Sequence, residues 1–367
     1  MAFGTFFLPG PTEVRPEILA VMTRPMIPHR GRDFEELFAR IEAGLRDVFL
    51  TARPVYVSTS SASGLMEGAI RNAPAGPVLA LVNGAFSARF AKIAAACARD
   101  TESLEVPWGA TFDLDDVERR LAARSFAAVT VVHSETSTGA LTDVRAVTEL
   151  AHRYGALCIV DSVTGVAGAE LRFDAWGLDF ALTGSQKALA LPPGLALGVA
   201  STEFLARARA VPNRGLYFDV VEFEEFAAKN QTPATPAISL LYALEAQLAD
   251  ILREGIDRRW ERHEAMRDAT VAWLKRAVTR VDLDVAILAP EGARSPTITT
   301  MTLPEGLKSA DVVHAVARRG FTIGTGYGSL KDTTIRIGHM GDHTMDTLRP
   351  CLAECEDALR DVGVKHW

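Results

Sequence analysis

Cysteine is scarce in this chain. Four cysteines occur among its 367 residues, and no two of them are spaced as Cys-x-x-Cys: Cys97, Cys158, Cys351 and Cys355. Zinc centres and disulfide frameworks are typical of sequences with closer and more numerous cysteines. We therefore expect reduced thiols in a cytoplasmic protein, and no metal site.

The sequence also lacks long uncharged apolar runs, internal repeats and low-complexity tracts. Its N-terminus has neither the basic start nor the apolar stretch of an export signal, and no segment is long enough to span a bilayer. Acidic residues outnumber basic ones, 46 to 39, which gives a net charge of −7. Because nucleic-acid binding requires clustered positive charge, we expect neither a membrane nor a nucleic-acid partner.

What the chain does contain is a regular alternation of short apolar runs and helical patterns between about residues 55 and 201. We predict strands near residues 55–58, 78–82, 127–133, 157–161, 180–183 and 196–200. Helices are predicted between strands at 86–98, 114–123 and 144–154. This alternation is typical of an α/β fold in which helices cover both faces of a mainly parallel sheet.

The pattern changes after Pro236. Two long helices are predicted at 238–252 and 258–278, and we expect them to bridge two domains. The rest of the chain predicts a smaller α+β domain, with strands at 297–303 and 334–338 and helices at 310–319 and 344–362. We expect an N-terminal segment crossing both domains, a large domain and a small C-terminal domain, with the bounds 1–20, 21–260 and 261–367.

Lys187 and Asp161 are the most informative pair in the sequence. Asp161 ends a run of apolar residues that predicts a buried parallel strand, so its carboxylate should lie at the carboxyl edge of the sheet, where such sheets bind ligands. Lys187 lies where another apolar stretch opens into small and polar residues, a setting that favours a neutral, nucleophilic amine. An aspartate that protonates a pyridine nitrogen and a lysine that forms an imine with an aldehyde describe a pyridoxal-phosphate site.

Three further segments follow predicted strands at the same edge. Thr59–Gly64 leads into a helix, whose N-terminal N–H groups would suit a phosphate, although a serine helix cap with nothing bound explains the same pattern. Thr136 could reach a ring hydroxyl of the cofactor, or serve only in a turn. Phe86 could stack on the ring, although core packing is the commoner fate of phenylalanine.

Arg336 alternates with two isoleucines in a predicted strand, which places the guanidinium and the isoleucines on opposite faces. A guanidinium on a strand suits the capture of a substrate carboxylate, and a surface salt bridge is the alternative. Three histidines near Arg30 or Arg336 share no ligand spacing, so we interpret them as local hydrogen-bonding groups: His29, His339 and His343.

Taken together, the motifs resemble the class V aminotransferases of pyridoxal-phosphate fold type I, in the branch of alanine/serine–glyoxylate and serine–pyruvate aminotransferases. The resemblance covers nearly the whole chain. It rests on several motifs in one order: Pro9-Gly-Pro-Thr12, Ser61-Ala-Ser-Gly64 with Met66-Glu67, Asn83-Gly84, Ser134-Glu-Thr-Ser-Thr-Gly139, Asp161-Ser-Val163, Thr183-Gly-Ser-Gln-Lys187, Leu191-Pro-Pro-Gly194, Thr232-Pro-Ala-Thr-Pro236 and Ile335-Arg-Ile-Gly338.

The resemblance implies a role for each matching residue. Lys187 would carry the cofactor and Asp161 would pair with its ring nitrogen, while Val163 and Phe86 would pack on the two faces of the ring. Thr136 would bind the ring hydroxyl. Four residues would hold the phosphate: Ser61, Ala62, Ser63 and Gln186.

Two further roles follow from the same resemblance. The neighbouring subunit would complete the phosphate site from the stretch Gln231–Thr235, in which the candidates are Gln231, Thr232 and Thr235. An obligate homodimer with shared active sites is therefore expected. Arg336 would hold the substrate carboxylate, with the backbone of Gly10 nearby. Where relatives usually carry a glycine-rich turn, this chain has Ser60–Ser63, and Gln231 stands where some relatives have a tyrosine.

We therefore predict a pyridoxal-phosphate-dependent aminotransferase that moves the amino group of serine or alanine to glyoxylate or pyruvate. One alternative is a donor with two negative charges, such as phosphoserine, if Arg30 and His29 reach the pocket. A cysteine desulfurase would need a mobile reactive cysteine, which Cys351 and Cys355 in a helical pattern do not provide. A binding protein without catalysis is the remaining alternative.

Overall fold

The computed structural model describes residues 3–282 and 284–363. Its larger sheet has seven strands in the order β2-β10-β9-β8-β5-β3-β4. All of them run in one direction except β10, which is antiparallel to both of its neighbours. The mainly parallel sheet predicted from the sequence is therefore confirmed. Its strands are β2 (Val55–Ser58), β3 (Val78–Val82), β4 (Thr101–Glu105), β5 (Ala128–Val132), β8 (Leu157–Asp161), β9 (Phe180–Gly184) and β10 (Ala196–Ala200).

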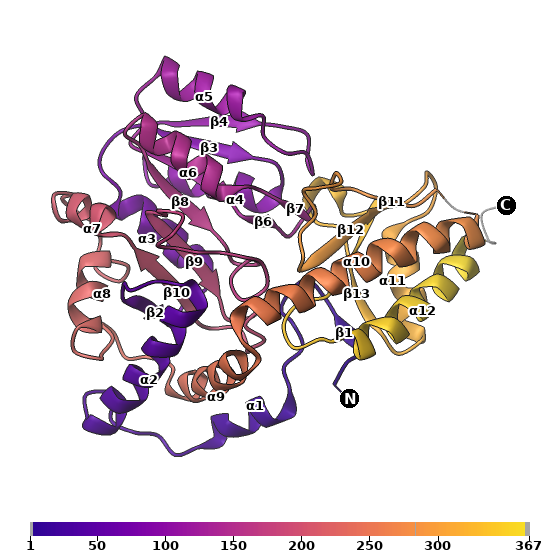
Figure 1. Cartoon of the computed structure of the whole chain (residues 1–367), viewed down its shortest axis with the longest axis horizontal. Helices are drawn as coiled ribbons and strands as arrows, with labels where there is room; N and C mark the ends of the chain where they lie inside the picture. Colours follow the sequence, from indigo (N-terminus) through magenta and orange to yellow (C-terminus); the bar gives the residue numbers. More distant parts are fainter. Residues whose placement is uncertain (1–2, 283, 364–367) are drawn as a thin grey trace.

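Both faces of this sheet are buried except at the edge strand β4, which explains why the other six strands are nearly continuous apolar runs. In β8, Cys158 and Val160 belong to one apolar core and Leu157 and Ile159 belong to the other, because successive side chains alternate across the sheet. The first core is covered by α2 (Arg32–Phe49), α5 (Leu114–Ala123), α6 (Val144–Arg153) and α9 (Ile238–Glu254). The second is covered by α3 (Ala62–Asn72), α4 (Ala85–Ala96), α7 (Thr202–Arg209) and α8 (Val220–Ala227), as Figure 1 shows.

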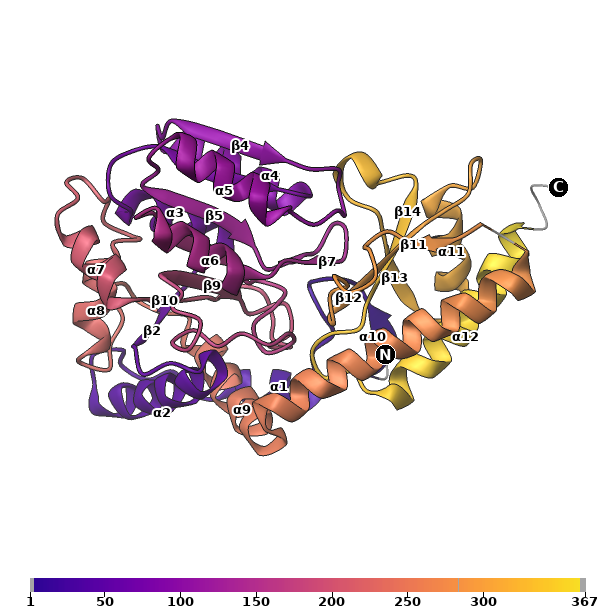
Figure 2. The same cartoon turned by 45° about the horizontal axis from the view of Figure 1, so that its top comes forward.

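A second, smaller sheet has five strands in the order β1-β13-β14-β12-β11. These are β1 (Phe6–Phe7), β11 (Ala286–Ile287), β12 (Ile298–Thr302), β13 (Thr322–Thr325) and β14 (Thr334–Gly338). Three helices pack beside it (Figure 2) around a third apolar core: α10 (Ile256–Val281), α11 (Ser309–Arg318) and α12 (Met345–Gly363). The short elements of the chain are α1 (Pro16–Ala20), η1 (Val21–Thr23), β6 (Ser134–Glu135), β7 (Ala140–Leu141) and η2 (Gly328–Leu330).

The N-terminal segment contacts the surroundings of both sheets. Phe6 pairs with Thr322 in the smaller sheet, because β1 lies parallel to β13. A few residues later, the backbone N–H of Thr12 donates to the carbonyl of Gln186, which follows β9 of the larger sheet, at 3.0 Å. The first residues of the chain therefore run past the carboxyl edge of β9, where Lys187 lies.

The two long helices also touch both parts of the molecule, as predicted. In α9, Gln247 is buried and its amide donates to Asp342, beyond β14, at 2.9 Å. In α10, the buried Arg259 donates to the carbonyls of Ala167 and Ala188 at 3.1 and 2.8 Å, while later residues of the same helix enter the core of the smaller sheet. The helix α10 passes without interruption through residue 260, where the boundary between the domains was expected. That boundary stays a prediction.

Two findings concern the whole described part of the chain. None of its helices is long and apolar enough to cross a bilayer. Its four cysteines are free thiols, and no group of three or more potential metal ligands occurs among the described residues.

Candidate active site

The carboxyl ends of β8 and β9 open into a cavity of about 390 Å³. Asp161 is the last residue of β8, and Lys187 lies in the loop that follows β9. Both residues line this cavity. Parallel neighbouring strands end at the same edge of a sheet, so the two loops deliver their side chains to one place. The structure thus brings together the pair on which the sequence-based hypothesis depends.

The Lys187 amine is buried beside the N-terminal segment. Its side chain is buried and its Nζ donates to the carbonyl of Pro9. Burial, and then the positive charge of Arg336, lower the pKa of Lys187 to about 8. The backbone of Gly10 crosses so close that an added Cβ would overlap the amine, and its φ of 114° is also one that glycine adopts readily. The amine is therefore partly neutral near physiological pH and held in one direction.

Asp161 is a buried carboxyl group with one free oxygen. Its Oδ1 accepts a hydrogen bond from the Val163 N–H at 2.8 Å, and Oδ2 has no hydrogen-bond partner among the described residues. Burial raises the pKa of Asp161 to about 7, in spite of that hydrogen bond. A carboxyl group in this state is stabilised as the anion when a cation binds beside it.

The N-terminus of α3 faces the same cavity. Ser61 is the N-cap residue, and its hydroxyl makes no capping hydrogen bond. Ser61, Ala62 and Ser63 all line the cavity, as does Gln186 from the loop after β9. The first N–H groups of a helix lack partners within the helix, and the helix dipole is positive there. This end of the cavity suits an anion such as a phosphate.

Apolar and hydroxyl side chains line the rest of the cavity. Phe86, Val163 and Thr136 are all among its lining residues. The centroid of the Phe86 ring lies 5.9 Å from the Lys187 Nζ and 5.3 Å from the ring of Tyr327, on which it stacks. The cavity therefore offers an aromatic face, a valine and a hydroxyl to a flat ligand.

Arg336 lies next to this cavity but is not among the residues that line it. Its neighbours Ile335 and Ile337 are fully buried in the core, as the predicted alternation requires. The guanidinium donates to the carbonyls of Thr325 and Thr136, at 2.8 and 3.1 Å. It has no carboxylate partner among the described residues, and burial lowers its pKa to about 10. A buried cation without an opposite charge is expected to bind an anionic group.

A model of the family "Aminotransferase class-V" matches residues 24–346. The chain belongs to the class V aminotransferases. It is similar to an uncharacterized aminotransferase of Methanocaldococcus jannaschii, with 35% identity over 97% of this chain and 92% of that protein. It is also similar to a serine–glyoxylate aminotransferase of Methylorubrum extorquens, with 32% identity over 98% and 92%. The solved structure of an alanine–glyoxylate aminotransferase from Nostoc superposes with a TM-score of 0.89, at 29% identity over 97% and 95% of the two chains.

Sequence reasoning assigned no role to Glu135 of this aminotransferase. Its carboxylate is fully buried and accepts hydrogen bonds from the N–H groups of Phe86 and Ser87, at 3.1 and 2.9 Å, and from the Ser137 hydroxyl at 2.6 Å. It thus caps α4 from the short strand β6 and fixes the position of Phe86. An acidic residue at a helix N-terminus is a favoured arrangement, but Glu135 and Phe86 are 49 residues apart, so the sequence carries no local signal of this contact.

Replacing Glu135 by glutamine should therefore loosen the wall of the site. We expect Glu135→Gln to lower the free energy of unfolding by about 2–3 kcal/mol, since a charged acceptor is lost and a buried amide faces N–H donors. Urea unfolding measures this loss. The control is Glu149→Gln, at an exposed position of α6. If the two variants proved equally stable, the carboxylate would not hold α4 in place.

Arg89 is a second residue that sequence reasoning missed. It lines the cavity from α4, one turn after Phe86, and its guanidinium lies 5.0 Å from the centroid of the Phe86 ring. Its Nη2 donates to the Tyr327 hydroxyl at 2.9 Å. The helical spacing from Phe86 could have indicated it, because residues three apart lie on one face of a helix. The site therefore has a second cation at its wall.

The segment Gln231–Thr235 does not reach the Lys187 cavity of its own chain. Arg30 donates to the Thr232 carbonyl at 2.7 Å and to the side chain of Gln231 at 3.2 Å. His29 lies 3.5 Å from the Thr235 hydroxyl. None of these residues lines the cavity that contains Lys187. Arg30 and His29 thus occupy a separate cluster with the segment expected to serve a neighbouring subunit.

Two histidines near Arg336 and two cysteines of α12 lie outside the Lys187 cavity. His339 bonds with the Thr299 hydroxyl at 2.9 Å and His343 with the carbonyl of Phe6 at 3.0 Å, so both are local hydrogen-bonding groups, as interpreted. Cys351 and Cys355 are buried in α12. The hydrogen bond to Cys355, together with burial, raises the pKa of Cys351. Buried thiols of this kind are poor nucleophiles.

Proposed function

We propose that this aminotransferase uses pyridoxal 5'-phosphate to move the amino group of serine or alanine to glyoxylate or pyruvate. The observation that supports this most directly is that Lys187 and Asp161 line one cavity. The residues present fit the cofactor, because the uncapped N-terminus of α3 suits its phosphate and the free oxygen of Asp161 suits its ring nitrogen. When bound, the cofactor supplies an electron sink for the bond that breaks at the α-carbon.

The protein's own groups would then position the reactants and move protons. Asp161, as an anion, would keep a proton on the ring nitrogen. The Lys187 amine, with its pKa lowered to about 8, would take a proton from the α-carbon of the substrate and return it elsewhere. Phe86 and Val163 would exclude water from the two faces of the ring. Arg336 would hold the substrate carboxylate.

Replacing Arg336 by lysine should weaken substrate binding more than it slows the chemistry. An ammonium cannot offer two parallel N–H groups to a carboxylate, so we expect the KM for amino donors to rise about 100-fold, with a smaller change in kcat. Steady-state kinetics with a single donor measure both constants. The control is Arg318→Lys on the exposed face of α11, and an unchanged KM in Arg336→Lys would exclude this carboxylate site.

The amino donor is the part of the proposal that a substrate panel tests. One relative is named for serine and another for alanine, and both are named for glyoxylate as the acceptor. Their sequence identities to this chain are similar, 32% and 29%. A panel of serine, alanine, aspartate and phosphoserine, each with glyoxylate and with pyruvate, tests the choice. Highest kcat/KM with serine or alanine is the expected result.

A donor with two negative charges is the second candidate. It is favoured by Arg89, which lines the cavity in addition to the nearby Arg336. The anion-binding pair proposed from the sequence, Arg30 and His29, lies instead with Gln231–Thr235. Highest kcat/KM with aspartate or phosphoserine would establish this candidate and overturn the first.

We further propose a cytoplasmic homodimer with shared active sites. In such a dimer Gln231, Thr232 and Thr235 would approach the phosphate bound by the other subunit. This is supported by their separation from the Lys187 cavity within one chain. Light scattering on the purified protein measures the assembly.

A further inference from the structure

A second cavity, of about 440 Å³, lies on the other side of the loop that follows β5. It opens between the start of α6, α10 and the segment 292–296. No residue that lines it also lines the Lys187 cavity. Its volume is within the range of small-molecule sites in proteins, about 300–1,000 Å³. It is therefore large enough to hold a small molecule.

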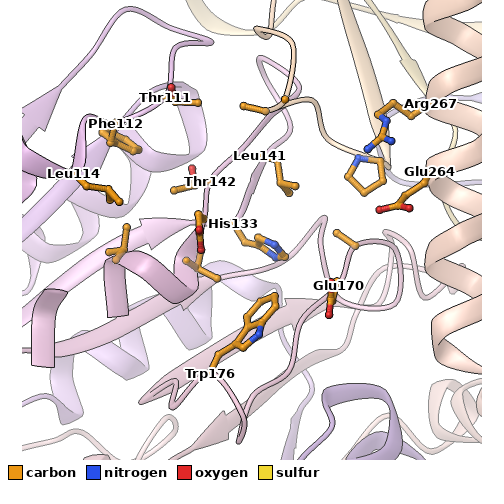
Figure 3. A pocket seen from close by; sticks show the side chains of 17 residues that line it. Thr111, Phe112, Leu114, His133, Leu141, Thr142, Glu170, Trp176, Glu264 and Arg267 are labelled. Carbon is orange, nitrogen blue, oxygen red and sulfur yellow. The ribbon is translucent and has the colours of Figure 1, made fainter. Parts of the chain in front are cut away.

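The interior of this cavity is mostly apolar. Its apolar side chains come from four segments of the chain, and Figure 3 shows Phe112 and Leu114 at one end and Trp176 below His133. The apolar lining residues are Phe112, Leu114, Leu141, Val144, Val147, Ala169, Trp176, Ala293 and Pro296. A surface of this composition suits an aromatic or aliphatic body rather than a fully polar ligand.

The interior also contains a buried hydroxyl without a partner. Thr142 is only 7% exposed, and its Oγ1 has no hydrogen-bond partner among the described residues. It lines the cavity beside His133, as Figure 3 shows. Burying an unpaired hydroxyl is costly, because its hydrogen bonds to water are lost without replacement. Because the Thr142 side chain lines the cavity, a rotation about its Cα–Cβ bond would present this hydroxyl to an occupant.

His133 adds a neutral polar group next to Thr142. Its Nδ1 lies 2.9 Å from the Ser162 hydroxyl, and its ring meets Trp176 edge to face at 6.4 Å. Burial lowers the pKa of His133 to about 4, so the ring is uncharged near neutral pH. The other ring nitrogen, Nε2, has no partner in the described part of the chain. The interior therefore offers hydrogen bonds but no charge.

The charge of this cavity lies at its rim and is mainly negative. Asp143, Glu170 and Glu264 contribute carboxylates, against the guanidinium of Arg267. Glu170 pairs with Arg172 at 2.5 Å and Arg267 with the adjacent Asp268 at 2.8 Å, outside the cavity lining. Within the described residues, neither Glu264 nor Asp143 has a cationic partner, and Asp143 only caps α6. A cationic ligand would be attracted to this rim.

We propose that this cavity is an accessory binding site for a phenolic ammonium compound. The aromatic body would lie on the apolar wall that includes Trp176, and the hydroxyl would bond with Thr142 and His133. The ammonium would remain at the rim with Glu264, which has no cationic partner within the described residues. This occupant satisfies at once the unpaired hydroxyl, the apolar interior and the excess of carboxylates.

The probe that tests this proposal is 4-(2-dimethylaminoethyl)phenol. As a tertiary amine it cannot form an imine with an aldehyde, so its binding is distinct from reaction at Lys187. Isothermal titration into the purified holoenzyme should show saturable binding. Removing the phenol hydroxyl from the probe should weaken binding about tenfold, and replacing the amine by a carboxylate, in 3-(4-hydroxyphenyl)propanoate, should abolish it.

Variants assign the site. Glu264→Gln and Thr142→Val should each weaken binding of the probe by about three- to tenfold. The matched control is Glu261→Gln, which lies three residues before Glu264 in α10, is also exposed and does not line the cavity. This variant should bind the probe as the wild type does. Thr142→Val should keep or raise the melting temperature of wild type, because the buried hydroxyl that it removes has no partner to lose. Absence of saturable binding, or equal binding by the wild type, Glu264→Gln and Thr142→Val, would overturn the proposal.

Discussion

Replacing Lys187 by alanine is expected to lower kcat by at least about 10⁴-fold. Lys187 is the one lysine among the described residues that line the cavity, so no neighbouring amine can take over its proton transfer. The variant should also lose the visible absorption band of the lysine-bound cofactor. Steady-state kinetics and an absorption spectrum of the purified protein measure both effects.

The matched control is Lys92→Ala, which removes an exposed lysine from α4. It should keep both the turnover and the spectrum of the wild type. A Lys187→Ala variant that also kept them would end the assignment of Lys187, and with it the proposed chemistry. Loss of the band with full turnover would show that the cofactor is attached at Lys187 but that catalysis proceeds through another base.

Asp161→Asn is expected to lower kcat by about 10²–10⁴-fold while leaving the protein folded. An amide cannot carry the negative charge that would keep a proton on the ring nitrogen. Without cofactor, however, the same substitution should stabilise the protein at alkaline pH. Activity and stability are thus expected to change in opposite directions.

The sign of the stability effect follows from the pKa. Burial raises the pKa of Asp161 from 3.8 to about 7, so the folded state keeps its proton at pH values where the unfolded state has lost it. The contribution of Asp161 to the free energy of unfolding is therefore fully present below about pH 4 and is lost as the pH rises to about 7. The loss corresponds to roughly 4 kcal/mol at most. Asparagine does not titrate, so the cofactor-free variant should exceed the wild type by most at pH 8.

Urea unfolding of the cofactor-free proteins at pH 5 and pH 8 measures this difference. The control is Asp179→Asn, because the Asp179 carboxylate is equally buried but accepts hydrogen bonds from the Cys158 N–H and from His152, at 2.7 and 2.8 Å. That variant should be less stable than the wild type at both pH values. An advantage of Asp161→Asn that did not grow between pH 5 and pH 8 would contradict the cost assigned to the buried carboxylate.

Six of the seven strands of the larger sheet were predictable because each of them is short, apolar and followed by turn residues. The edge strand β4, with the polar sequence Thr-Glu-Ser-Leu-Glu, was not predicted. The predicted strand 157–161 coincides with β8, and the predicted helix 114–123 coincides with α5. The helix α2 went unpredicted although its apolar residues recur every three or four positions: Phe34, Leu37, Phe38, Ile41, Leu45, Val48 and Phe49. The helical period of α2 is therefore readable from the sequence alone.

Other elements carry no such signal. The strand β1 has only two residues, Phe6–Phe7, and exists because β13 offers it an edge. Two residues cannot show a period, so pairing of this kind becomes visible only when distant segments meet. The same holds for Glu135, whose carboxylate accepts hydrogen bonds from α4 and from Ser137, just beyond β6.

By itself, the sequence determined the class of fold, the family and the identity of Lys187, Asp161 and Arg336 as the groups to test, because strand periodicity and side-chain chemistry are local properties. Only the tertiary structure decided which groups share a cavity, which are desolvated and which lack partners. It placed Arg89 beside Phe86, kept Gln231–Thr235 away from the Lys187 of the same chain, and left Thr142 unpaired in a second cavity. Distances and burial depend on contacts between segments far apart in the chain, and these determine the pKa of each group.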